Sequence, residues 1–200
     1  QNLDSESDAE EQLETSQQIL EQTRRITRIV ESLVTFSHSG GIKQSAHHVP
    51  VNVRDTVDEA ISLLLLDPDH RLQQFENHCA SDGWAHGDPQ RLLQVFINLL
   101  GNAADACTAE QAIRIYCEET EAYLEVRVED QGHGIPEGMH DTLFEPFATS
   151  KAPGRGTGLG LALVYSIIEE HFGSISVESP ICDAGGTRFI IRLPIHAASL

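Results

Sequence analysis

Positive charge is scarce in this sequence. Only 13 residues are Lys or Arg, against 31 Asp and Glu, so the formal net charge is −18. Proteins that bind the phosphate backbone of DNA or RNA present clustered basic residues. The composition argues against such a module, and we expect no nucleic-acid partner. A polyanionic ligand would have to be held by backbone N–H groups, a metal ion and a few well-placed cations.

Long apolar segments are also lacking. The longest run, residues 61–66, is broken by Ser62 and is far too short to cross a bilayer. No signal peptide is visible, and Gln1 in place of Met suggests a fragment, which leaves an upstream membrane anchor open. We expect a cytoplasmic domain without direct membrane contact. A hydrophobic content of 40% is enough for an ordinary core.

Cysteines are few and scattered, and none forms a C-x-x-C pair. The four are Cys79, Cys107, Cys117 and Cys182. The spacing indicates no disulfide framework, so we interpret all four as reduced, packed thiols of a cytosolic protein.

The segment 13–36 has a heptad pattern without Gly or Pro. Ile19, Ile26 and Leu33 recur every seven residues, and Ile29 and Phe36 follow three positions after two of them. This a/d stripe predicts a helix that pairs with others in a bundle or dimer. An ordinary surface helix is the alternative. Residues 37–41 end in two glycines and predict a hinge, so we divide the chain into domains 1–41 and 42–200.

The second domain alternates short strands and helices, which predicts an α+β fold. Asn52 resembles a helix N-cap, as does Asp88 before Pro89. Helices are expected at 53–64, 90–106 and 160–171. Strands are expected at 49–51, 75–79, 84–86, 113–117, 123–129, 175–178 and 187–193.

The helix at 90–106 is apolar on most sides, yet one stripe is polar. The members of that stripe are Arg91, Gln94, Asn98, Asn102 and Asp105. Asn98 and Asn102 lie one turn apart on the same face. Their amides are satisfied either by the backbone of the core or by a ligand or metal ion, and amide oxygens suit Mg²⁺.

Two glycine motifs flank a segment rich in Phe. The first, D-x-G-x-G at 130–134, follows a strand and permits close approach of a flat ligand; a simple turn is the alternative. The second has four glycines at alternate positions in 154–160, before an apolar helix whose free N–H groups attract phosphate; a flexible linker is the alternative. It matches neither a Walker A loop nor the dinucleotide fingerprint.

Lys151 and Arg155 lie beside the second glycine motif. In so acidic a chain their position indicates phosphate contacts, although solvated surface cations are the alternative. The preceding residues 144–147, Phe-Glu-Pro-Phe, look like the anchor of a mobile lid.

Taken together, these motifs resemble the catalytic core of bacterial sensor histidine kinases. Residues 98–106 look like the N box, 130–134 the G1 box, 144–147 the F box, 156–161 the G2 box and 185–187 the last glycine motif. The order and spacing match over about residues 48–194, and 147–161 is similar to the nitrogen-regulatory variant. The resemblance implies a two-layer α/β sandwich, the Bergerat-type ATP-binding fold, with a mixed sheet of about five strands and helices on one face.

The resemblance also implies roles for individual residues. Asn102 would hold Mg²⁺ with Asn98 close by, and Asp130 would hydrogen-bond the adenine amino group. Lys151 would act with both asparagines in catalysis. The full set implied to bind ATP is Asn98, Asn102, Asp105, Asp130, Gly132, Gly134, Ile135, Lys151, Arg155, Gly156, Thr157, Gly158, Leu159, Gly160, Leu161 and Thr187.

One position separates subclasses of this fold. Related gyrase-, chaperone- and mismatch-repair-type ATPases carry a Glu four residues before the metal-binding Asn, as a base for water, whereas this chain has Asn98. An amide cannot take a proton. We therefore predict slow hydrolysis and phosphoryl transfer to a histidine.

The phosphoacceptor motif of the family is His-Glu/Asp-x-x-Asn/Thr-Pro. None of the ten histidines in this sequence begins such a motif. Segment 13–36 resembles the second helix of the dimerisation and phosphoacceptor hairpin, so the acceptor would precede residue 1. The implied partners are that hairpin within a homodimeric full-length protein and the receiver domain of a response regulator. Alternatives are an anti-sigma-type serine kinase and a catalytically silent regulatory module of the same fold.

Overall fold

The computed structural model describes residues 48–81, 83–151 and 156–195, together with Thr15 and Thr23. The predicted helix at 13–36 and the hinge at 37–41 lie outside these residues, apart from those two threonines, so the domain division stays a prediction. Within the described part of the chain, no helix is both long and apolar enough to cross a membrane.

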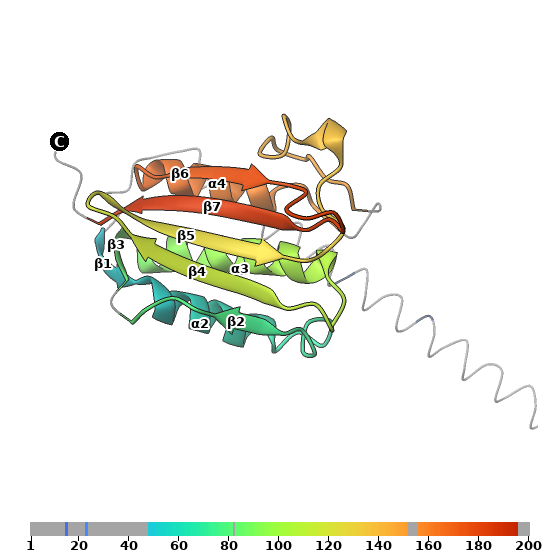
Figure 1. The fold of residues 1–200 in the computed structure, drawn as a ribbon, viewed down its shortest axis with the longest axis horizontal. Helices are drawn as coiled ribbons and strands as arrows, with labels where there is room; N and C mark the ends of the chain where they lie inside the picture. Colours follow the sequence, from blue (N-terminus) through green and yellow to red (C-terminus); the bar gives the residue numbers. More distant parts are fainter. Residues whose placement is uncertain (1–14, 16–22, 24–47, 82, 152–155, 196–200) are drawn as a thin grey trace, which may run out of the picture.

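A five-stranded mixed sheet forms one layer of the molecule (Figure 1). Its strand order is β2-β4-β5-β7-β6, with β2 parallel to β4 and the other pairs antiparallel. The strands are β2 (Phe75–Asn77), β4 (Ile113–Glu119), β5 (Tyr123–Asp130), β6 (Ser174–Glu178) and β7 (Thr187–Pro194). A separate two-stranded antiparallel sheet joins β1 (Val49–Asn52) to β3 (Trp84–Gly87).

Three helices form the second layer, behind the sheet in Figure 1: α2 (Val53–Leu64), α3 (Pro89–Ala106) and α4 (Gly160–Glu170). The central helix α3 contributes Leu92, Val95 and Phe96 to the core, each with no exposed surface. Both predicted N-caps form: Asn52 Oδ1 accepts the N–H of Asp55, and Asp88 Oδ1 accepts two N–H groups of the first turn of α3. The expected two-layer α/β sandwich is confirmed.

Alternation along β5 fixes where its polar end points. Leu124, Val126 and Val128 are buried against the helices, and the same period of two carries Asp130 to the buried face. Asp130 is paired in register with Thr187, the first residue of β7. The Asp130 carboxyl group is thus buried at the end of β5, at the margin of the core.

Several of the few arginines form ion pairs on the outer face of the sheet. Arg188 bonds Glu129 and Glu178 at 2.7 Å each, and Arg192 bonds Glu125 at 2.9 Å. Arg114 and Arg127 make similar cross-strand pairs. These cations are on the side of the sheet opposite the helices and are not available to a ligand held by α3.

The prediction of four free cysteines was wrong for two of them. Cys79 and Cys117 form a disulfide, whereas Cys107 and Cys182 are free. The parallel pairing of β2 with β4 sets Asn77 opposite Ile115, and two residues further the same register brings the cysteines together. A separation of 38 residues hides this pairing in the sequence.

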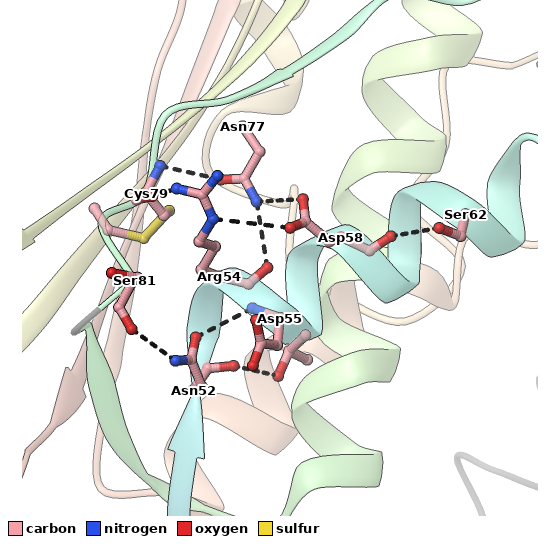
Figure 2. A network of polar contacts seen from close by, with 10 residues as sticks. Asn52, Arg54, Asp55, Asp58, Ser62, Asn77, Cys79 and Ser81 are labelled. Carbon is pink, nitrogen blue, oxygen red and sulfur yellow. Dashed lines mark hydrogen bonds and ion pairs between the residues drawn. A yellow bond between two sulfur atoms is a disulfide. The ribbon is translucent and has the colours of Figure 1, made fainter.

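A polar network ties the first turns of α2 to this same edge of the sheet (Figure 2). Arg54 donates to the carbonyl of Cys79 at 2.5 Å, and Asn77 donates to Asp58 at 2.7 Å. The Asn77 side chain also accepts the N–H of Cys79. The strand β2 ends at Asn77, two residues before the predicted end at residue 79.

Candidate functional site

The Asp130 carboxyl group is the most deeply buried acid of the described residues. Its side chain is 3% exposed, and Oδ1 accepts the N–H of Gly132 at 2.9 Å and that of Thr187 at 3.2 Å. Burial raises the pKa of Asp130, and the hydrogen bonds from Gly132 and Thr187 partly oppose that rise. A buried carboxyl held in one orientation by backbone donors is suited to recognising a hydrogen-bond donor on a ligand.

The glycines after β5 allow three segments to converge. A Cβ on Gly132 would lie 2.5 Å from the carbonyl oxygen of Ala106, at the end of α3. The Gly132 carbonyl accepts the N–H of Gly186 at 2.8 Å, just before β7. Gly134 has φ +75°, and a Cβ there would lie 3.0 Å from Ser179 Oγ. Only glycine fits these two contacts without displacing its neighbours.

Ser179 is a site residue that the sequence analysis missed. Its hydroxyl accepts the N–H of Ile135 at 2.9 Å and donates to the carbonyl of Gly186 at 2.9 Å. It therefore links the loop after β5 to the loop before β7. No local pattern marks a lone serine of this kind, because its partners are distant in sequence.

The polar stripe of α3 forms a second group of contacts. Asn98 Nδ2 donates to the carbonyl of Gln94 at 2.9 Å, and a Cβ on Gly160 would lie 2.9 Å from Asn98 Oδ1. The start of α4 therefore lies directly against the asparagine face of α3. Part of the amide is satisfied by backbone, as one of the two sequence alternatives proposed, and its oxygen faces the glycine motif.

Lys151 joins this group from the segment after the Phe motif. Its Nζ donates to Asn102 Oδ1 at 3.0 Å and to Asp105 Oδ2 at 2.5 Å. The other Asp105 oxygen bonds His70 Nε2 at 3.2 Å. His70, in the turn between α2 and β2, was also missed by the sequence analysis. Lys151 is thus paired within the protein, and its predicted contact with phosphate stays a prediction.

The Phe motif and the second glycine motif interlock through backbone. Phe147 N–H bonds the carbonyl of Gly158 at 2.8 Å, and both residues have positive φ, +69° and +67°. A Cβ on Gly158 would lie 2.4 Å from the carbonyl carbon of Phe147. Thr157 Oγ1 accepts the N–H of Leu159, which is buried and precedes the first turn of α4.

The structure thus brings most predicted site residues to one end of α3. Beyond the C-terminus of α3 lie Asp130, Gly132, Gly134, Ile135 and Thr187. Along its last turns lie Asn98, Asn102, Asp105, Lys151 and Gly160. Gly156 lies beside Lys151, and Leu161 packs partly buried against the core. Arg155 lies outside the described residues, so its predicted role remains a prediction.

Comparison with known proteins places this arrangement in a family. The family described as histidine kinase-, DNA gyrase B- and HSP90-like ATPases matches residues 87–197, which contain α3, the loops described above and β7. The chain belongs to this family. The resemblance read from the five motifs is confirmed, and the domain is of the ATP-binding type.

Curated relatives are similar over most of the chain. The sensory histidine kinase/phosphatase NtrB of Rhodobacter capsulatus is 36% identical over 95% of this chain and 55% of its own length. The sensor histidine kinase ZraS of Escherichia coli K12 is 31% identical over 90% of this chain and 37% of its own length. The chain therefore spans about half of the first protein and less of the second.

Solved structures agree with this assignment. The catalytic domain of histidine kinase ThkA, in a nucleotide-free form, has a TM-score of 0.65 and 30% identity, covering 74% of this chain and 96% of that domain. The mycobacterial sensor histidine kinase MprB has a TM-score of 0.66 and 27% identity, over 74% of this chain and 97% of the other.

Proposed function

We propose that this domain transfers the γ-phosphate of ATP to a histidine outside residues 1–200, from which it passes to an aspartate of a response regulator. The observation that carries the proposal is the buried Asp130 carboxyl, oriented by two backbone N–H groups and joined through Gly132 to the asparagine-bearing helix α3. Such a carboxyl can select the base while α3 handles the phosphates. Family membership supports ATP as the ligand.

Asp130 supplies the selectivity for adenine in this proposal. The exocyclic amino group of adenine is a donor, whereas guanine presents a carbonyl oxygen at the corresponding position. An ionised carboxyl accepts only, so it binds the first and repels the second. Gly132 and Gly134 allow the loop that follows Asp130 to pack closely against the end of α3 and against Ser179, which would hold this side of the base site in place.

Mg²⁺ would be held by the Asn102 oxygen. The residues present fit this ion, since Asn102 Oδ1 already accepts a hydrogen bond from a cation, the Lys151 ammonium, and Mg²⁺ prefers oxygen ligands. When bound, the ion neutralises phosphate charge during transfer. The N–H groups at the start of α4, which has no side-chain cap and begins near Asn98, would hold phosphate oxygens.

Asn98 supports transfer to a protein group in preference to water. Its amide is tied to the carbonyl of Gln94 and cannot accept a proton at physiological pH. A water molecule near the γ-phosphate therefore lacks a base at this position. Phosphoryl transfer otherwise depends on positioning and charge neutralisation, which the site residues supply.

The wider setting follows from the same proposal. The acceptor hairpin would come from the same full-length protein, acting as a homodimer in the cytoplasm, where ATP is available. The receiver domain of a response regulator would be the next partner. Residues 1–41 would contribute the second helix of the hairpin.

The test is transfer to a supplied acceptor hairpin. We would incubate the purified chain with labelled ATP and Mg²⁺, with and without a separately made hairpin carrying the acceptor histidine. Acid-labile, base-stable phosphate should form on the hairpin and stay near background on the chain alone. A hairpin with His→Gln at the acceptor is the matched control. Acid-stable phosphate on serine, or efficient labelling of the isolated chain, would contradict the proposal.

A further inference from the structure

A chain of three polar contacts crosses the phosphate end of the site. His70 contacts Asp105 Oδ1 at 3.2 Å, Asp105 Oδ2 contacts Lys151 Nζ at 2.5 Å, and the same ammonium contacts Asn102 Oδ1 at 3.0 Å. The four side chains come from the turn after α2, from the segment after the Phe motif and, for Asn102 and Asp105, from α3. The motif resemblance places Asp105 in the nucleotide site, but it does not say what the carboxylate does there.

His70 donates a hydrogen bond from Nε2 to the Asp105 carboxylate. Its Nδ1 atom is buried and has no hydrogen-bond partner among the described residues. The arrangement with least cost puts the proton on Nε2, which then donates to the carboxylate, because a buried N–H without a partner costs more than an unpaired lone pair. Both oxygens of Asp105 are therefore engaged, although its side chain is 42% exposed.

Lys151 and a bound metal ion would compete for one atom. The Asn102 oxygen that accepts the ammonium at 3.0 Å is the proposed ligand of Mg²⁺. Two cations on one oxygen repel each other strongly at such short range. Arrival of the metal therefore displaces Lys151 from Asn102. The freed ammonium can then bind phosphate only if it also leaves Asp105.

We infer that Asp105 is a positioning residue that makes nucleotide binding depend on Mg²⁺; the inference rests on the proposed function. Without the metal, Asp105 and Asn102 keep the Lys151 ammonium paired within the protein, so it does not contact the triphosphate. With the metal, the ammonium is displaced from Asn102 and the local positive charge outweighs the carboxylate. Asp105 thereby penalises metal-free ATP more than the Mg²⁺ complex.

The experiment is a calorimetric titration of ATP into three proteins, each with Mg²⁺ and again with EDTA. The proteins are the native chain, Asp105→Asn and the control Glu110→Gln, which removes an equal charge from an exposed residue five positions away. We expect Asp105→Asn to tighten metal-free binding about fivefold, the scale of a partly exposed ion pair. Binding with Mg²⁺ should change by less than about twofold, so the ratio of the two affinities falls.

A second comparison tests whether Asp105 acts through Lys151. In a Lys151→Met background, Asp105→Asn should change the affinity ratio no more than Glu110→Gln does. An equal change of both affinities in Asp105→Asn, or a ratio identical to that of Glu110→Gln, would overturn this inference and leave the proposed function intact. A native chain that binds ATP under neither condition would overturn both.

Discussion

The buried carboxyl of Asp130 is placed for ligand recognition at a cost to the fold. Burial raises its pKa in the folded chain above the unfolded value, so the proton is held more tightly in the folded state. The contribution to stability is then greatest at low pH and is lost as pH rises through the folded pKa. At neutral pH the ionised group opposes folding.

Asp130→Asn should therefore not destabilise the protein at pH 7. The amide oxygen keeps both backbone N–H bonds while the buried charge is removed, so we expect equal or higher stability, by up to about 1 kcal/mol. The advantage should shrink toward pH 4, where the native carboxyl takes up its proton. Urea unfolding at both pH values measures this. A loss of more than about 2 kcal/mol at pH 7 would mean that the charge itself holds the loops together.

Gly132 is expected to tolerate no side chain. Gly132→Ala would place a Cβ 2.5 Å from the Ala106 carbonyl oxygen, which forces the loop away from α3. We expect a loss of about 1–3 kcal/mol in unfolding free energy. Gly138→Ala is the matched control, because a Cβ there has nothing within 4 Å. Equal stability of the two variants in urea would show that the loop does not press against α3.

At this scale the sequence predicted residue types better than their partners. The motifs singled out Asp130 because it precedes two glycines at the end of a strand, and Asn98 and Asn102 because they form a polar stripe on an otherwise apolar helix. The donors to Asp130 include a backbone N–H from residue 187, which no pattern reveals. His70 and Ser179 were missed because each acts through a contact with a distant segment, 35 residues away for His70 and 44 for Ser179.

At the scale of the elements, His171 links the end of α4 to the start of α3, on the side remote from the glycine motifs. His171 Nε2 accepts the N–H of Asp88 at 2.9 Å, at the N-cap of α3, and Nδ1 donates to the carbonyl of Ile167. The ring of His48 stacks on it at 4.7 Å, and His86 lies 5.8 Å from His48. The contact with Asp88 requires the neutral ring, since a protonated Nε2 cannot accept, whereas Nδ1 donates to Ile167 in either state.

This cluster should make the fold sensitive to mild acid. Burial lowers the pKa values of His48 and His171 below their ordinary value of 6.5, and in each case Asp88 and Glu170 only partly oppose this. A lowered folded pKa means that stability is complete above about pH 6.5 and falls as pH drops toward the folded value. The native chain should lose unfolding free energy between pH 7.5 and pH 5.5.

His48→Phe isolates part of this effect. The ring keeps the stack on His171 but cannot be protonated, so the loss between the two pH values should be smaller than in the native chain. His140→Phe, outside the cluster, should lose as much as the native chain. Urea unfolding at each pH gives the comparison. An unchanged pH dependence in His48→Phe would mean that His48 does not contribute to the loss of unfolding free energy in acid.

For the elements themselves, the predicted positions hold to within a few residues, whereas their pairing was not predicted in detail. Caps and apolar periodicity locate α2 and α3 from local sequence alone. The separate pairing of β1 with β3, and the parallel placement of β2 beside β4, depend on contacts between distant segments. The disulfide was missed for the same reason, since it follows from that parallel register.

For the whole molecule, the disulfide closes a loop of 38 residues between the edge and the interior of the sheet. Such a link lowers the entropy of the unfolded chain by an amount worth up to about 4 kcal/mol. Reduction should therefore lower the unfolding free energy by about 2–4 kcal/mol. A double variant, Cys79→Ala with Cys117→Ala, should be insensitive to reductant. Urea curves with and without dithiothreitol decide, and superimposable native curves would contradict the prediction.

The net charge of −18 shapes how the molecule binds a polyanion. Four arginines are committed to the outer face of the sheet, and Lys151 is paired inside the site. Binding of ATP must therefore draw on the base-selecting carboxyl, backbone donors and a metal ion more than on free cations. The selectivity of this binding depends first on whether Asp130 recognises the adenine base.

The measurement that tests this most directly is calorimetric titration of ATP and GTP, with Mg²⁺, into the native chain and Asp130→Asn. We predict that the native chain binds ATP in clear preference to GTP, and that Asp130→Asn weakens ATP binding at least tenfold and loses the preference. Equal binding of both nucleotides by the native chain, or unchanged ATP affinity in a folded Asp130→Asn, would contradict it.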